Sequence, residues 1–120
     1  MHQYSFEKLE VWTDAKLLVK QIYKLTESFP TSEQFGITNQ IRRAAVSVAS
    51  NIAEGTSRKT KKEQARFSQI AYSSLMELLT QIILCFEMEM LSEEDYHAVR
   101  SAIETISYKL NGLYNSQIKS

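Results

Sequence analysis

The sequence predicts an all-α protein, an antiparallel four-helix bundle with up-down-up-down topology. Apolar residues recur at spacings of three and four in four long segments, and the breaks between these segments are short. The 120 residues include only three glycines and one proline, whereas a turn-rich β fold needs both residues at its corners. Because this length fits one domain, we expect residues 1–120 to form a single bundle domain.

The first helix is predicted over about residues 8–28. Its apolar residues alternate in spacings of four and three, which places them on one helical face. They are Val11, Ala15, Leu18, Ile22, Leu25 and Phe29. Pro30 ends the segment, because it disfavours helical geometry at the preceding residue and has no backbone N–H to donate.

The second helix is predicted over about residues 33–54, with Thr31 or Ser32 as its N-cap. Its core stripe consists of Ile37, Ile41, Ala44, Val48 and Ile52. Gly55 follows directly, and we expect it to stop the helix in a left-handed conformation.

The third and fourth helices are predicted over about residues 61–90 and 93–115. Thr60 and Glu63 have the spacing of a capping box, in which each side chain bonds the backbone N–H of the other residue. Ser92 is a natural N-cap for the fourth helix. The core stripe of that helix consists of Tyr96, Val99, Ile103, Ile106, Leu110 and Leu113, and the polar tail after Leu113 is expected to fray.

Two helices have more apolar surface than one core face requires. The second helix has an additional stripe of small residues, Val46, Ala49 and Ala53, and the third is apolar around most of its circumference, including Leu79 and Ile83. Surplus apolar surface indicates a partner, so we expect these five residues to lie in a homo-oligomer interface. The alternative is that both helices are simply more central in the bundle.

Charge and composition exclude several classes of protein. The 14 basic residues balance the 14 acidic ones, so the chain is not a globally basic nucleic-acid binder. No secretory signal and no run of about 20 apolar residues is present, and we therefore expect a cytoplasmic protein with no membrane partner. Cys85 is the only cysteine and lies in an apolar run, which predicts a buried, unreactive thiol.

The sequence indicates no catalytic residue, no metal site and no cofactor. A di-metal site in a four-helix bundle needs two Glu-x-x-His pairs and two further carboxylates. Glu94 and His97 supply one such pair, but the only other histidine is His2. No histidine has a helical spacing to Ser47, Ser50, Ser73 or Ser74, and no glycine-rich phosphate loop is present.

Charged residues are segregated along the chain. Five basic residues stand against Glu63 alone in the turn between the second and third helices: Arg58, Lys59, Lys61, Lys62 and Arg66. Five acidic residues flank the next turn: Glu87, Glu89, Glu93, Glu94 and Asp95. In an antiparallel bundle these turns lie at opposite ends, which predicts a molecule with one basic and one acidic end. A basic end favours phosphate binding, and Arg42 and Arg43 would add to it if they face outward. The alternative is a solvated turn whose charges only aid solubility.

Several blocks of the sequence resemble one known family. They are Phe6–Trp12, Ile22–Thr26, Phe35–Val48 with its Gln-Ile-Arg-Arg-Ala-Ala motif, and Ser50–Gly55 with Asn-Ile-Ala-Glu-Gly. Together with the pattern from Lys62 to Gln81, they resemble the four-helix bundle proteins encoded in intervening sequences of 23S ribosomal RNA genes. The resemblance implies a bacterial protein, a ring-like homopentamer and no catalytic activity. It also points to a related accessory protein of diversity-generating retroelements, which binds nucleic acid and a reverse transcriptase through a basic surface.

These observations support two hypotheses. The first is a non-enzymatic oligomeric bundle that binds RNA or DNA through Arg42, Arg43 and the cluster from Arg58 to Arg66. The second is a protein–protein interaction scaffold with no role in nucleic-acid binding. The neutral net charge, unlike that of the retroelement protein, weighs on the side of the second hypothesis.

Overall fold

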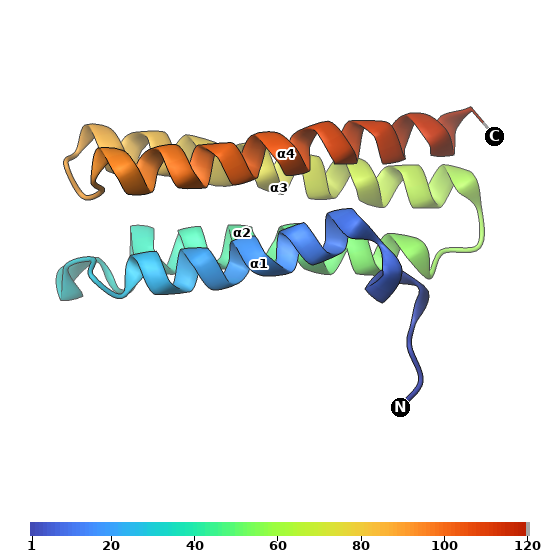
Figure 1. Cartoon of the computed structure of the whole chain (residues 1–120), viewed down its shortest axis with the longest axis horizontal. Helices are drawn as coiled ribbons and strands as arrows, with labels where there is room; N and C mark the ends of the chain where they lie inside the picture. The colour runs from blue at the N-terminus through green and yellow to red at the C-terminus, as the bar shows by residue number, and fades with distance from the viewer. Residues whose placement is uncertain (120) are drawn as a thin grey trace.

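A computed structural model of the chain describes residues 1–119 and consists of four long helices (Figure 1). These are α1 (Glu10–Thr26), α2 (Ile37–Thr56), α3 (Lys61–Glu87) and α4 (Glu93–Ile118). Two short 3₁₀ helices, η1 (Ser5–Lys8) and η2 (Thr31–Glu33), precede α1 and α2. No strand occurs between residues 1 and 119, so the predicted all-α class is confirmed.

Consecutive helices run antiparallel and form an up-down-up-down bundle, as predicted (Figure 1). Helix α2 packs on α1 and α3, α3 packs on α4, and α4 closes the bundle against α1. The molecule measures 45 × 31 × 22 Å. This length is close to that of α3 alone, because 27 residues at about 1.5 Å per residue span about 40 Å.

The core consists of the apolar stripes that the periodicity predicts. Each helix turns one stripe inward, and most side chains of these stripes are buried in a single cluster. Leu25, Ile37, Tyr96 and Leu113 are partly buried and pack against it. The largest fully buried members are Leu18, Ile22, Ile41, Val48, Leu75, Leu78, Ile82, Cys85, Val99, Ile103, Ile106 and Leu110. Burial of apolar surface is the main force that holds the helices together.

The start of α2 differs from the prediction. Thr31 and Glu33 lie in η2, and the helix begins only at Ile37, so neither Thr31 nor Ser32 caps it. Its N-cap is Gly36, which has no side chain to bond the first-turn amides. The chain reverses direction after Pro30, and the residues predicted to form the first turn of this helix lie in η2 and in the turn that follows it.

Helix α3 ends at Glu87, three residues before the predicted end. Glu89 adopts a left-handed φ of 61°, and the amides of Glu89 and Met90 bond the carbonyls of Phe86 and Cys85 at 3.0 and 2.9 Å. This pattern is a Schellman motif, which ends a helix by satisfying its last carbonyl groups. The motif usually has glycine at the left-handed position. Because Glu89 occupies it here, the sequence does not indicate that the helix ends at this point.

Helix α4 continues to Ile118 instead of fraying after Leu113. Gln117 is buried, and its Oε1 accepts a hydrogen bond of 2.8 Å from Ser68 Oγ on α3. This polar contact fixes the last turn of α4, which the apolar periodicity alone does not predict.

Gly55 does not adopt the predicted left-handed conformation, since it lies within α2 and no described glycine has a positive φ. Glycine is instead required at this position because a side chain would collide with α3. A Cβ at this position would stand 3.0 Å from Phe67 Cβ on α3. Gly55 is buried against α3, and more than two helical turns earlier in α2, Ser47 Oγ and Ser74 Oγ share a 2.8 Å hydrogen bond between the same two helices.

Helix α3 is the one described helix whose length and composition would suit a membrane span, with a mean hydropathy of 1.3 over its most apolar window. Its contacts with α2 and α4 are also the most extensive between helices of the bundle. A central bundle helix needs the same composition, so we interpret its apolar character as core packing.

The close approach at Gly55 predicts opposite outcomes for two glycine-to-alanine substitutions. Gly55→Ala should lower the free energy of unfolding by about 1 kcal/mol, because the cost of overpacking exceeds the gain in helix propensity. Gly112→Ala should raise it by about 0.5–1 kcal/mol, since nothing lies within 4 Å of the added Cβ. Urea unfolding followed by circular dichroism measures both, and equal stabilisation by the two changes would contradict the steric role of Gly55.

Candidate nucleic-acid interface

The turn between α2 and α3 presents its basic side chains to solvent. Arg58, Lys59, Lys61, Lys62 and Arg66 are all exposed. The sole ion pair among them joins Arg66 to Glu63 at 3.8 Å, a long and exposed contact that contributes little. The other four cations have no acidic partner within residues 1–119.

The backbone of this turn is held by local hydrogen bonds. Thr60 caps α3 by accepting a 3.1 Å bond from the Glu63 amide, which forms half of the predicted capping box, while the Glu63 carboxylate faces Arg66 instead. Gln64 Nε2 donates to the Arg58 carbonyl at 2.9 Å, and the Arg58 guanidinium lies 4.6 Å from the centre of the Phe67 ring. The turn therefore presents its charges from an ordered frame.

Two further cations, which were not predicted to bind nucleic acid, lie at the same end of the bundle. Lys8 lies in η1, which packs against α2, and Lys119 follows the end of α4; both are exposed. Figure 1 shows both chain termini at the same end as the α2–α3 turn. We call this surface the basic end and define it as Lys8, Arg58, Lys59, Lys61, Lys62, Arg66 and Lys119. Only the antiparallel packing brings residues so distant in the chain together.

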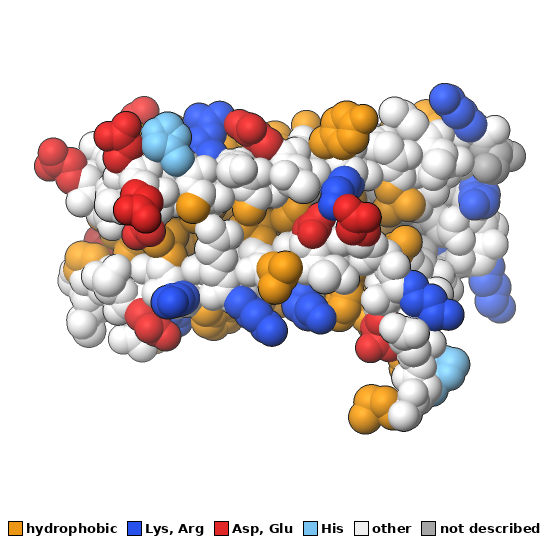
Figure 2. All heavy atoms as spheres, in the orientation of Figure 1, with side chains coloured by type: hydrophobic (Ala, Val, Ile, Leu, Met, Phe, Trp, Pro, Cys, Tyr) orange, Lys and Arg blue, Asp and Glu red, His pale blue; other side chains and the backbone are white. Residues whose placement is uncertain are grey.

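Acidic side chains gather at the opposite end, around the α3–α4 turn (Figure 2). Glu87, Glu89, Glu93, Glu94 and Asp95 are all exposed there. The helix dipoles largely cancel at both ends, because two N-termini and two C-termini meet at each. The side chains alone therefore produce the axial charge separation that the sequence predicts.

The structure does not bring Arg42 and Arg43 to the basic end. They lie near the start of α2, and the 16 residues between Arg42 and Arg58 correspond to about 24 Å along the bundle. Arg42 is half-buried against α1, and its Nε donates to Thr26 Oγ1 at 2.8 Å. Arg43 is exposed and borders a hollow between α2 and α3, opposite Glu77. A single surface built from both arginines and the turn cluster is therefore not present in one chain.

The residues predicted to form an oligomer interface differ in exposure. Val46 is 40% exposed, whereas Ala49, Ala53, Leu79 and Ile83 are half-buried within the chain itself. Ala49 and Leu79 also pack against the core cluster. Larger exposed apolar side chains occur on α3 and next to the ends of α2 and α3: Phe35, Ile70, Leu84 and Met88.

The polar residues considered for catalysis have structural roles. Ser47 and Ser74 bond each other, and Ser68 bonds Gln117. Burial, with a smaller contribution from Glu33, raises the pKa of the Cys85 thiol to about 11, so the thiol stays protonated at neutral pH. His97 lies 3.5 Å from Glu93 on the exposed first turn of α4. Within residues 1–119, no three His, Cys, Asp or Glu residues are grouped to hold a metal ion.

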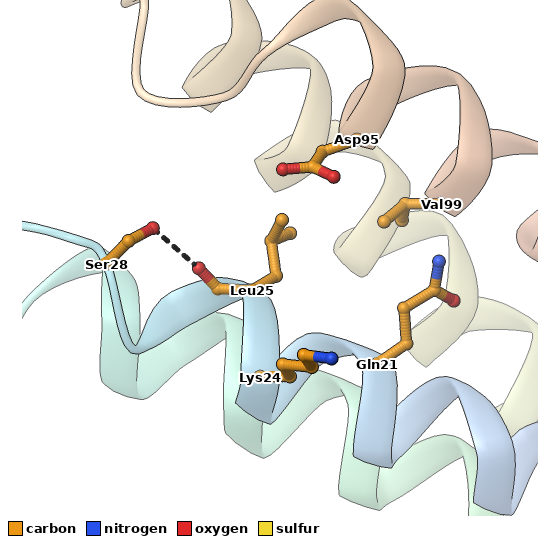
Figure 3. A pocket seen from close by; sticks show the side chains of 6 residues that line it. All are labelled: Gln21, Lys24, Leu25, Ser28, Asp95 and Val99. Atoms are coloured by element: carbon orange, nitrogen blue, oxygen red, sulfur yellow. Dashed lines mark hydrogen bonds between the residues drawn. The ribbon is translucent and has the colours of Figure 1, made fainter.

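A shallow hollow of about 330 Å³ between α1 and α4 also lacks reactive groups (Figure 3). It is lined by Gln21, Lys24, Leu25, Ser28, Asp95 and Val99. The Ser28 hydroxyl donates to the Leu25 carbonyl at 3.1 Å, so it is engaged in ending α1. No arrangement of nucleophile, base and orienting group is present in this hollow.

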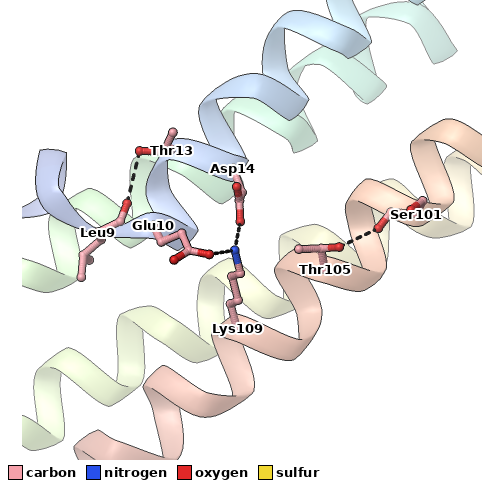
Figure 4. Close-up of polar contacts among 7 residues, drawn as sticks. All are labelled: Leu9, Glu10, Thr13, Asp14, Ser101, Thr105 and Lys109. Atoms are coloured by element: carbon pink, nitrogen blue, oxygen red, sulfur yellow. Dashed lines mark hydrogen bonds and ion pairs between the residues drawn. The ribbon is translucent and has the colours of Figure 1, made fainter.

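One ion bridge joins α1 to α4 near the basic end (Figure 4). Lys109 Nζ on α4 lies between two carboxylates of α1, at 2.6 Å from Asp14 Oδ2 and in contact with Glu10 Oε1. The hydrogen bond to Asp14, then that to Glu10, raises the pKa of Lys109 above its ordinary 10.5. Because two carboxylates share one ammonium group, the bridge as a whole carries one net negative charge beside the basic end.

These features define a helical bundle with polarised ends. A family model for the 23S rRNA-intervening sequence protein matches residues 7–112, and the chain belongs to this family. It is a family of small helical proteins of unknown function and is not a known enzyme family.

The chain is also similar to a solved structure from Bacteroides thetaiotaomicron, a protein of unknown function from the S23 ribosomal protein family. The two are 19% identical with a TM-score of 0.81, over 88% of this chain and 95% of the other. At this identity the likeness shows the shared fold alone. No curated protein matches the sequence.

The ion bridge predicts a stability contribution that is lost at alkaline pH. Because the pKa of Lys109 is raised in the folded state, the bridge stabilises fully below pH 10.5 and loses its effect as the pH rises through the folded value. Lys109→Met should therefore be less stable than the parent at pH 8, and the difference should shrink above pH 11. Thermal unfolding at several pH values measures this difference in stability. The control is Lys20→Met, a change at an exposed lysine. A difference that does not vary with pH would contradict an ionic role.

Proposed function

We propose that this protein binds RNA or DNA through the phosphates of the nucleic acid, using the basic end of the bundle. The observation that carries the proposal is the grouping of seven exposed cations at one end. They outnumber the acids there, which are Glu7, Glu54, Glu63 and the one net negative charge of the Lys109 bridge. Lysine and arginine that neutralise phosphates release condensed counterions, and this release drives association.

The neutral net charge does not weigh against this proposal. The acidic cluster around the α3–α4 turn lies at the opposite end of the bundle, whose long axis measures 45 Å, while the Debye length at physiological ionic strength is about 8 Å. A phosphate at the basic end is therefore screened from the acidic end. The acidic end would in turn repel nucleic acid and orient the protein on it.

The shape of the basic end favours phosphate contacts over base reading. Its cations are mostly lysines on a turn, and lysine acts as a point charge without the planar geometry that reads base edges. The stacked Arg58 is held on Phe67, which leaves an ordered guanidinium for a phosphate. We therefore expect binding with little preference for sequence.

We infer further that the bundle forms a homo-oligomer in the cytoplasm, and the family resemblance favours a ring of five. Support comes from apolar side chains that one chain leaves in water, including Phe35 at 89% exposed, Leu84 at 47% and Val46 at 40%. Ring assembly would repeat the basic end, and several weak phosphate contacts would then act together.

A second candidate function is a protein–protein scaffold without a nucleic-acid role. The same exposed apolar side chains on α2 and α3 favour it, because such surface would suit a protein partner as well as a second copy. This candidate predicts that substitutions at the basic end leave binding of the protein partner unchanged.

The nucleic-acid proposal is tested by fluorescence anisotropy with labelled structured RNA and labelled duplex DNA, at low salt and at about 0.15 M salt. The variant combines Arg58→Gln, Lys59→Gln, Lys61→Gln and Lys62→Gln. The parent should bind both polymers and weaken steeply with salt. In the variant, the slope of log K against log salt should become shallower by about 3–4 for duplex DNA, because each lost phosphate contact contributes about 0.9.

The matched control combines Lys16→Gln, Lys20→Gln and Lys24→Gln, which removes exposed charges along α1 (the row of Lys and Arg over that helix in Figure 2). This control should retain the salt dependence of the parent. Equal loss in both variants would indicate a non-specific charge effect, and no binding by the parent at low salt would favour the scaffold.

The oligomer is tested by light scattering after size exclusion. Leu84→Glu and Val46→Glu should each shift the chain toward monomer, since a charge would be buried at the interface without a partner. Leu17→Glu, at an exposed position on α1, is the control and should leave the mass unchanged. A monomeric parent at all concentrations would exclude the assembly.

A further inference from the structure

A small polar cavity lies at the end of the bundle opposite the basic end, where the chain passes from α1 through η2 into α2. Its volume is about 200 Å³, below the range of about 300–1,000 Å³ that is typical of sites for drug-sized ligands. The cavity is lined by Thr26, Glu27, Phe29, Pro30, Thr31, Gln34, Thr38 and Arg42. Five of these eight side chains carry hydrogen-bond donors, which suits a small acceptor-rich ligand.

Thr38 is the wall residue whose buried hydroxyl has no partner. Its side chain is 6% exposed, and its hydroxyl forms no hydrogen bond with any group of the described chain. A buried hydroxyl without a partner is costly and is rarely left so in a folded protein. Rotation about a single side-chain bond would let this hydroxyl serve a ligand in the cavity.

The N-terminus of α2 stands beside Thr38 and is also unsatisfied. Its N-cap is Gly36, which supplies no side-chain acceptor, and the amides of Ile37, Thr38 and Asn39 have no partner in the described structure. Free first-turn amides donate hydrogen bonds to anions, although the α1 C-terminus beside them offsets the helix dipole. A carboxylate or phosphate oxygen would satisfy groups that the chain itself leaves open.

Arg42 supplies a fixed positive charge one helical turn after Thr38, on the same face of α2. Its Nε donates to Thr26 Oγ1 at 2.8 Å, its Nη2 approaches the Tyr23 carbonyl at 3.4 Å, and its guanidinium lies 4.6 Å from the centre of the Tyr23 ring. No carboxylate lies within ion-pair distance of it in residues 1–119. The half-buried guanidinium is held in place, and Nη1 remains without a partner.

Glu27 is the one acidic residue in the cavity wall. It is exposed, so water screens its charge more than it screens the half-buried charge of Arg42. We therefore expect Glu27 to weaken anion binding without abolishing it. Removal of its charge by substitution tests whether binding at this site is electrostatic.

From these features we propose that the cavity is a binding site for a single tetrahedral oxyanion, either inorganic phosphate or the phosphate group of a small phosphomonoester. Arg42 would neutralise the charge, the hydroxyl of Thr38 would donate to one oxygen, and the first-turn amides of α2 would complete the contacts. Arginine with hydroxyl and amide donors is the donor set that suits phosphate. This site is separate from the basic end, which lies at the other end of the bundle.

The site is tested by titrating isotope-labelled protein with inorganic phosphate at constant ionic strength and recording amide and arginine side-chain resonances. We expect saturable shifts at Ile37, Thr38, Asn39 and the Arg42 Nε–H. Titration with glycerol 3-phosphate separates the two sources: shifts with both indicate a site open to phosphomonoesters, and shifts with phosphate alone indicate a closed site for the free ion. No saturable shifts with either, or shifts confined to the basic end, would overturn the proposal.

Substitutions provide an independent check. Arg42→Gln should weaken phosphate binding at least about tenfold, because a charged hydrogen-bond donor is lost, and Glu27→Gln should tighten it. Thr38→Val should raise the melting temperature in phosphate-free buffer, since it removes an unpaired buried hydroxyl, and should reduce the further rise that phosphate produces.

The control is Thr105→Val on α4, where the hydroxyl bonds the Ser101 carbonyl at 3.1 Å in an exposed position. It should leave the phosphate-induced rise intact. A Thr38→Val protein that keeps the full phosphate effect, or a Glu27→Gln protein that binds phosphate no more tightly, would count against the assigned geometry.

Discussion

The close contact between α2 and α3 is the constraint on which the rest of the bundle depends. Gly55 leaves room for Phe67, and the Ser47–Ser74 hydrogen bond joins the same two helices further along. Small side chains at these points let the two helices pack closely. With this pair fixed, α1 packs on α2 and α4 packs on α3, so the closed core follows from one tight antiparallel contact.

The same antiparallel contact decides where the charges lie. It places the α2–α3 turn and both chain termini at one end, which combines Lys8, the turn cluster and Lys119. Since the helix dipoles oppose one another at each end, the side chains determine the potential. Phe67 takes part in both the helix packing and the charged surface, because it packs against Gly55 and also lies under the Arg58 guanidinium.

Features at the helix ends were the least predictable. The sequence pattern locates the N-caps Thr60 and Ser92, whose hydroxyls accept bonds from the Glu63 and Asp95 amides. It does not reveal the Schellman motif at Glu89 or the buried Gln117, because their signals are contacts with distant residues and not local propensities. Arg42 shows the same limit: adjacent to Arg43 in sequence, it packs against α1 while Arg43 faces solvent.

The sequence by itself determined the helical class, the number of helices, the core stripes and the opposite charges of the two central turns. These properties follow from periodicity and from residues close together in the chain, which a helix converts directly into faces and ends. Tertiary structure alone decided the steric role of Gly55, the addition of Lys8 and Lys119 to the basic end, and the cavity beside Thr38 and Arg42. Each of these depends on which residues of separate helices meet, and that is set by packing rather than by local sequence.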